Sequence, residues 1–142
     1  MMPDKLQILL VDDEPSILKI VGKRLEIEGF KVLVATNGQD ALKKAKQEAP
    51  ALIILDLMLP KLNGFQVCRL LKFDQHFSHI PVILFTARTD EKDKVLGLDC
   101  KADAYVCKPF QAGELLGHIR RLLPQSAPLG RLPKDAGSGP AQ

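Results

Sequence analysis

Two hydrophobic patterns alternate along residues 6–123 of the chain. Short apolar runs, typical of buried strands, are each followed by a segment whose apolar residues recur every three or four positions, as on one side of a helix. The runs predict strands at 6–11, 31–35, 51–56, 80–85 and 102–107. The segments that follow them predict helices that end near Gly29, Pro50, Phe73, Cys100 and Leu123. Strict alternation with short connections predicts right-handed crossovers and a parallel sheet covered on both faces, which is a three-layer α/β/α domain.

The third apolar run, from Ala51 to Leu59, contains a single charged residue, Asp56. Pro50 and Pro60 flank this run, and its isoleucines and leucines are typical of a strand buried on both faces of a parallel sheet. In open α/β sheets, ligands bind beyond the carboxyl ends of the strands, which is where Asp56 lies. Taken alone, such an aspartate more often marks only the point at which a hydrophobic strand reaches water. The other strand ends therefore decide its role.

Polar residues also follow other strands of the predicted sheet. Asp12 and Asp13 end the first strand, Thr86 the fourth and Lys108 the fifth. In a parallel sheet these ends share one rim with Asp56. Three carboxylates at one place raise one another's pKa unless a cation lies among them. Oxygen ligands, few fixed contacts and room for a phosphate favour Mg2+ as that cation, with Mn2+ as a second choice.

This set of residues predicts phosphoryl chemistry at the rim. Lys108 supplies a compact positive charge for a phosphate, and the Thr86 hydroxyl can donate a hydrogen bond to one of its oxygens. An aspartate carboxylate can act as a nucleophile toward phosphorus. Because Asp56 lies on the central strand, with partners on both sides, we expect it to be that nucleophile.

Composition predicts one folded domain, residues 1–123, followed by a flexible tail or linker, residues 124–142. Of the 142 residues, 46% are hydrophobic and 26% are charged, which suits one sizeable core and leaves little for a second domain. After residue 123 the chain is rich in proline and glycine and poor in apolar residues.

Cys68, Cys100 and Cys107 lack the paired spacing of zinc or redox sites, so we expect structural thiols.

Charge and hydropathy argue against several classes of partner. The net charge of +3 comes from basic residues spread along the chain, which argues against direct binding of nucleic acid. No apolar segment is long enough to span a membrane, and the first residues lack the pattern of a secretion signal. An odd number of cysteines fits a reducing compartment. We therefore expect a cytoplasmic protein that does not bind membranes.

Residues 5–123 resemble the receiver domain of two-component response regulators, the CheY-like superfamily. The resemblance rests on Asp12-Asp13, Asp56, Leu59-Pro60, Gly64, Thr86-Ala87 and Lys108-Pro109-Phe110. Residues 88–98 are similar to those of the receivers found in winged-helix transcription factors. The resemblance implies a flavodoxin-like fold, in which the five parallel strands have the order 2-1-3-4-5.

The resemblance also implies a function and a site. In such a domain, Asp56 would accept a phosphoryl group from the phosphohistidine of a sensor histidine kinase. Asp12, Asp13, Asp56 and the backbone carbonyl of Met58 would hold Mg2+, and Lys108 would bind the phosphoryl oxygens.

A conformational switch is implied as well. Thr86 would move toward the phosphoryl group, and Tyr105 would turn inward to fill the space that Thr86 leaves. The bond between Lys108 and Pro109 would be cis. The switch would change the surface formed by the fourth helix, the fifth strand and the fifth helix, and so control a downstream protein or a tethered effector domain. We expect a monomer or a weak, phosphorylation-dependent dimer.

Two alternatives remain open. An aspartate-nucleophile phosphatase would carry a second aspartate two residues after the nucleophile, but Met58 occupies that position. A degenerate receiver, which mediates interactions without being phosphorylated, would not need the complete set of five polar residues at the strand ends. We therefore expect a phosphoacceptor that takes part in its own phosphorylation and dephosphorylation, and not an enzyme.

Overall fold

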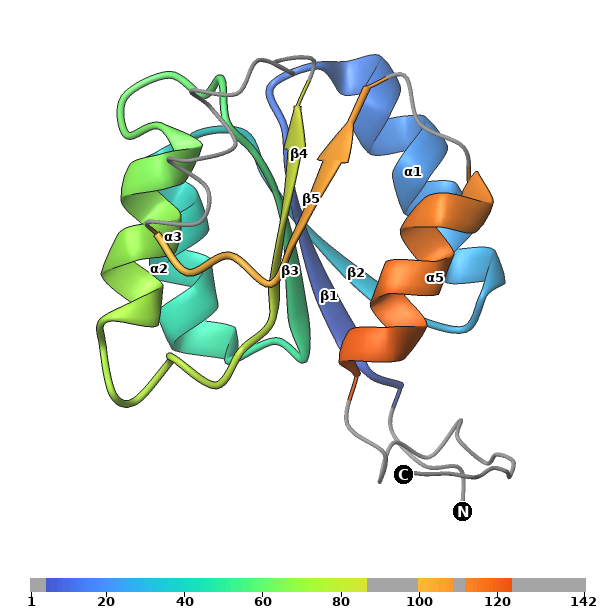
Figure 1. Cartoon of the computed structure of the whole chain (residues 1–142). Coiled ribbons are helices and arrows are strands. Elements are labelled where there is room, and N and C mark those ends of the chain that lie inside the picture. The colour runs from blue at the N-terminus through green and yellow to red at the C-terminus, as the bar shows by residue number, and fades with distance from the viewer. Residues whose placement is uncertain (1–4, 87–99, 109–111, 124–142) are drawn as a thin grey trace.

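A five-stranded parallel sheet forms the centre of the computed structural model, which describes residues 5–86, 100–108 and 112–123. The strand order is β2-β1-β3-β4-β5, with neighbouring strands parallel, as expected from the sequence. The strands are β1 (Gln7–Val11), β2 (Lys31–Ala35), β3 (Leu52–Asp56), β4 (Val82–Thr86) and β5 (Ala104–Cys107). Their carboxyl ends share the upper rim of the domain in Figure 1, so the residues that follow them are brought together.

Helices cover both faces of the sheet and make the three layers that the sequence predicts (Figure 1). The described helices are α1 (Pro15–Ile27), α2 (Gly38–Glu48), α3 (Gly64–Lys72) and α5 (Ala112–Leu122). Helices α2 and α3 lie on one face, and α1 and α5 lie on the other. The helix expected near residues 90–100 lies outside the described residues.

The core is divided by the sheet, because successive side chains of a strand point to opposite faces. Strand β3 is buried at every position, which fits its unbroken apolar sequence. Ile53 and Leu55 pack in the cluster on the α2 and α3 side, whereas Leu52 and Ile54 pack in the cluster on the α1 and α5 side. A strand buried on both faces holds the backbone of Asp56 firmly in place.

The helix starts near the rim follow from local capping residues. Asn37 accepts a hydrogen bond from the backbone N–H of Asp40 at 2.8 Å and so caps α2. Asn63 and Gln66 form a reciprocal capping box at the start of α3. These caps fix where the two helices begin after the loops of the rim.

The boundaries of β4 and β5 differ most from the sequence prediction, and β1 and β3 each begin one residue later than predicted. Strand β4 begins at Val82 and not at Ile80, because the Ile80 N–H donates to the Phe77 carbonyl of the preceding turn and Pro81 has no N–H. Strand β4 also extends through Thr86. Strand β5 begins at Ala104, two residues later than predicted. The carboxyl ends, which carry the predicted site, are close to their predicted positions.

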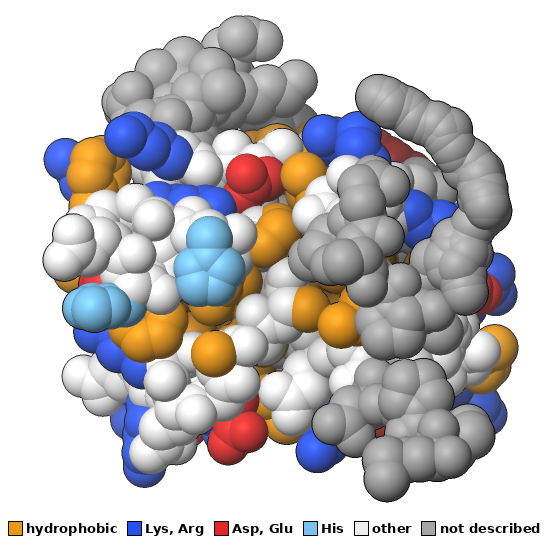
Figure 2. Space-filling model, turned by 90° about the horizontal axis from the view of Figure 1, so that it is seen from below, with side chains coloured by type: hydrophobic (Ala, Val, Ile, Leu, Met, Phe, Trp, Pro, Cys, Tyr) orange, Lys and Arg blue, Asp and Glu red, His pale blue; other side chains and the backbone are white. Residues whose placement is uncertain are grey.

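The end of the domain opposite the rim carries a mixed surface. In Figure 2, which looks at this end, acidic, basic and apolar side chains of the described residues are interspersed. Within the part of the chain that the structure describes, no helix has the length and apolar character needed to cross a membrane.

Candidate functional site

Three carboxylates meet at the rim of the sheet. Strands β1 and β3 are neighbours, and their ends place one carboxylate oxygen each of Asp12, Asp13 and Asp56 within 4.8 Å of one another. Asp12 and Asp56 are buried, with 0% and 3% of their surface exposed, whereas Asp13 faces solvent. This cluster of oxygen ligands suits a hard divalent cation, because the carboxylates otherwise repel one another.

Among the described residues, Lys108 supplies a cation that contacts two of these acids, Asp12 and Asp56. From the end of β5, its Nζ donates to Asp12 Oδ2 at 2.8 Å, to Glu14 Oε1 at 3.3 Å and to Asp56 Oδ2 at 3.5 Å. The same nitrogen lies 4.9 Å from the centre of the Phe85 ring. Burial lowers the pKa of Lys108, but the hydrogen bond to Asp12 and the charges of Asp56 and Asp12 outweigh it and leave the pKa raised. Lys108 is therefore a fixed positive charge at neutral pH.

The surroundings of Asp56 disfavour its ionised form. Burial, together with the charge of Asp12, raises the pKa of Asp56 from 3.8 to about 6, although Lys108 and the Met58 N–H favour the ionised form. The Met58 N–H donates to Asp56 Oδ1 at 3.2 Å, and Oδ2 faces Lys108 at the longer distance of 3.5 Å. At neutral pH Asp56 is thus mostly ionised but weakly solvated, which suits a nucleophile.

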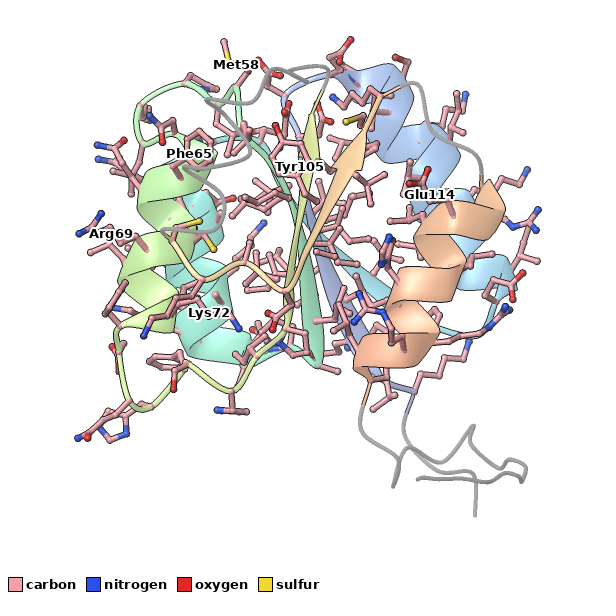
Figure 3. All side chains as sticks on the ribbon, in the orientation of Figure 1. Met58, Phe65, Arg69, Lys72, Tyr105 and Glu114 are labelled. Carbon is pink, nitrogen blue, oxygen red and sulfur yellow. The ribbon has the colours of Figure 1, made fainter. Side chains whose placement is uncertain are left out.

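The loop after β3 packs directly on the backbone of Asp56. A Cβ atom at Gly64 would lie 2.3 Å from the Asp56 carbonyl oxygen, and the Gly64 N–H donates to the Leu57 carbonyl at 3.0 Å. Only glycine fits at this position without a shift of the backbone. Met58, whose backbone N–H contacts Asp56, lies at the rim, and its side chain is exposed (56%; Figure 3).

The two residues expected to form a switch lie on the neighbouring strands. Thr86 is the last residue of β4, directly after Phe85, which is the Cα partner of Asp56 on β3. Tyr105 is partly buried on β5 and packs against the core cluster on the α2 and α3 side (Figure 3). The fold therefore brings the backbone of Thr86 beside the acidic cluster.

The cis bond expected between Lys108 and Pro109 involves residue 109, which lies outside the described residues.

Sequence reasoning did not assign two residues that contact the Lys108 ammonium. Glu14 directly follows Asp12-Asp13 in the chain, but nothing in that acidic run indicates that its side chain turns toward β5. Phe85 was predicted as part of the fourth strand, and the pairing of β4 with β5 places its ring beside Lys108. The strand pairing places the Phe85 ring, whereas the contact of Glu14 depends on how the chain leaves β1 for α1.

The fold and this rim of acids and lysine define a class of signalling domain, and comparison with known proteins agrees. The chain belongs to the response regulator receiver domain family, whose model matches residues 8–120. It is therefore a receiver domain of two-component systems, a family in which phosphorylation on aspartate is typical. This confirms the resemblance seen in the sequence.

Particular relatives include transcriptional regulators. The chain is 43% identical over 136 residues to the alkaline phosphatase synthesis transcriptional regulatory protein PhoP of Bacillus subtilis, covering 94% of this chain and 56% of PhoP. It is 44% identical over 117 residues to the DNA-binding response regulator MtrA of Mycolicibacterium smegmatis, covering 82% of this chain and 50% of MtrA. The chain thus spans about half the length of the curated relatives it matches.

A solved receiver domain shares the fold over most of the chain. The BeF3-activated DrrB receiver domain is 34% identical, with a TM-score of 0.75, and the match covers 84% of this chain and 97% of that domain. The order of the strands and the layers of helices are therefore those of a known receiver.

Proposed function

We propose that Asp56 is the phosphoacceptor of this receiver domain and takes its phosphoryl group from the phosphohistidine of a sensor histidine kinase. The observation that carries this proposal is the contrast between Asp56 and Asp12, the two buried carboxylates of the cluster. Asp12 Oδ1 accepts from the Glu14 N–H at 2.9 Å, and Asp12 Oδ2 accepts from Lys108 at 2.8 Å. Both oxygens of Asp12 are held by these bonds, whereas among the described residues Asp56 Oδ2 is contacted by Lys108 at the longer distance of 3.5 Å.

The chemistry needs one free oxygen on a carboxylate. An Asp56 oxygen attacks phosphorus and forms a P–O bond, while the P–N bond to the donor imidazole breaks and the ring nitrogen keeps the electron pair. Lys108 Nζ lies 3.5 Å from Asp56 Oδ2, which supports a role for Lys108 in binding an oxygen of the transferred group. Thr86, at the end of the adjacent strand, would donate its hydroxyl hydrogen to another.

The three aspartates fit a magnesium ion. Their oxygens lie within 4.8 Å of one another, and carboxylates are ligands that this ion accepts. Asp12, Asp13, Asp56 and the backbone carbonyl of Met58 would hold Mg2+, or Mn2+ in its place. When bound, the ion neutralises charge on the phosphoryl oxygens during transfer.

Phosphorylation then acts as a switch on a partner. The added negative charge favours the conformation in which Thr86 and Lys108 reach the phosphoryl oxygens, and Tyr105 moves inward beside them. This change shifts the population of conformations of the surface that includes β5 and α5. That surface contacts a downstream protein or a tethered effector domain. Because PhoP and MtrA are named as transcriptional and DNA-binding regulators, a tethered DNA-binding domain is the favoured effector.

Incubation with acetyl phosphate and Mg2+ tests the proposal. We expect one phosphoryl group per chain, visible in the intact mass and lost at alkaline pH, and no adduct on Asp56→Asn. Sustained hydrolysis of phosphate monoesters would instead support a phosphatase. Failure of the wild-type protein to form any adduct, with acetyl phosphate or with a phosphorylated kinase, would support a receiver that only mediates interactions.

A further inference from the structure

Lys108 is held by a carboxylate that has no part in the proposed chemistry. Of its three acidic partners, Asp12 and Asp56 belong to the cluster that fits a metal ion, whereas Glu14 does not. Glu14 Oε1 lies 3.3 Å from Lys108 Nζ. The three acids follow strands β1 and β3. The charge of Glu14 therefore adds to the electrostatic attraction of the Lys108 ammonium toward the end of β1.

The backbone of Glu14 is fixed, while its side chain reaches outward. Its N–H donates to Asp12 Oδ1 at 2.9 Å, and its carbonyl accepts from the N–H groups of Ile17 and Leu18 in the first turn of α1. The Glu14 side chain is 59% exposed, whereas that of Lys108 is 13% exposed. A carboxylate anchored in this way can pair with Lys108 without itself being part of the buried cluster.

We propose that Glu14 is a positioning residue that competes with the phosphoryl group for Lys108. This inference rests on the proposed function of Asp56. When Asp12 binds a metal ion, its hydrogen bond with Lys108 weakens, because the same carboxylate then contacts both the ion and the ammonium. Glu14 lies outside the metal cluster and keeps its contact with the ammonium. Lys108 must give up this contact, wholly or in part, to bind a phosphoryl oxygen on Asp56.

The competition sets how favourably the phosphorylated state forms. Replacing Glu14 with glutamine keeps its size and removes the charge that attracts Lys108. The ammonium is then freer to bind the phosphoryl group. Exposed ion pairs contribute little each, so we expect Glu14→Gln to tighten binding of a phosphoryl mimic by about two- to fivefold.

The test measures beryllofluoride binding in the presence of Mg2+, since beryllofluoride mimics a phosphoryl group on a carboxylate. Four proteins form a double-mutant cycle: wild type, Glu14→Gln, Lys108→Gln and the double variant. Glu26→Gln is the matched control, because it removes the same charge from an exposed position near the other end of α1. We expect tighter binding for Glu14→Gln than for Glu26→Gln, and no such gain when Lys108 is absent.

A second measurement needs neither metal nor mimic. Hydrogen exchange of the Lys108 ammonium, followed by NMR in the presence of a chelator, should be faster in Glu14→Gln than in wild type and unchanged in Glu26→Gln. Unchanged exchange in Glu14→Gln would overturn the proposal even if the Lys108→Gln variants bind no mimic. An equal gain with and without Lys108, or weaker binding in Glu14→Gln, would also overturn it. A wild-type protein that neither binds beryllofluoride nor forms an adduct would refute the function of Asp56 itself, and the role of Glu14 with it.

Discussion

Ionised Asp56 destabilises the metal-free fold, so Asp56→Asn should make the protein more stable at neutral and alkaline pH. Asp56 is 3% exposed, and burial with the charge of Asp12 raises its pKa from 3.8 to about 6. Between these two values the folded protein holds a proton that the unfolded chain has lost. The contribution of Asp56 to stability is therefore greatest below pH 3.8 and is lost as the pH rises through about 6.

The size of the change in stability follows from the shift in the pKa of Asp56. A rise from 3.8 to about 6 corresponds to a penalty of about 3 kcal/mol for the fully ionised group. Between about pH 4.5 and about pH 8, the part of this penalty that develops is about 2 kcal/mol. The stability of Asp56→Asn relative to wild type should grow by that amount over this range, because asparagine has nearly the same shape and carries no charge.

Urea unfolding with a chelator present, at several pH values, measures this difference directly. Glu26→Gln serves as the control for the change in net charge. An advantage of Asp56→Asn that stays constant or shrinks as the pH rises would refute the claim that the fold raises the pKa of Asp56. Addition of Mg2+ should then stabilise wild type more than Asp56→Asn, because the variant lacks one of the three carboxylates.

Three further substitutions test the packing of the domain, one at the site and two at the other end of helices α2 and α3. Gly64→Ala should lower the free energy of unfolding by about 1–3 kcal/mol, because its Cβ would meet the Asp56 carbonyl; unchanged urea stability would contradict this. Ala49→Gly should raise the free energy of unfolding by up to about 1 kcal/mol and so raise the melting temperature, because Ala49 ends α2 with a left-handed φ of 45°. A lower melting temperature would show that the strain is absent. Lys72→Met should cost about 1–3 kcal/mol in urea unfolding, because the buried Lys72 ammonium pairs with Asp103 at 2.7 Å; a more stable variant would mean that apolar packing outweighs the pair.

The layers and the rim of the sheet could be predicted from the sequence because each strand is a short apolar run. The run that ends at Asp56 lies between Pro50 and Pro60, and these prolines define its limits well. Once the strands are parallel, their carboxyl ends must meet. For this reason the order of elements places Asp12, Asp13 and Asp56 on one rim, and the pairing of β1 with β3 brings them close together.

Other features of the site depend on the directions in which side chains point, and the sequence pattern does not give these directions. Asp12 and Asp13 are adjacent in the chain, yet one is buried and the other faces solvent, because consecutive side chains at a strand end point opposite ways. The contact of Glu14 with Lys108 joins residues 94 positions apart. It depends on how α1 leaves β1, and hydrophobic periodicity carries no information about that angle.

We assign the phosphoryl group to Asp56 and not to another acid of the cluster. The most direct measurement is to phosphorylate the protein with acetyl phosphate and Mg2+, reduce the acyl phosphate with borohydride, and locate the reduced residue by peptide mass spectrometry. We expect the reduced residue to be Asp56 in wild type and no reduced residue in Asp56→Asn. Reduction at Asp12 or Asp13 in the wild-type protein would contradict the assignment.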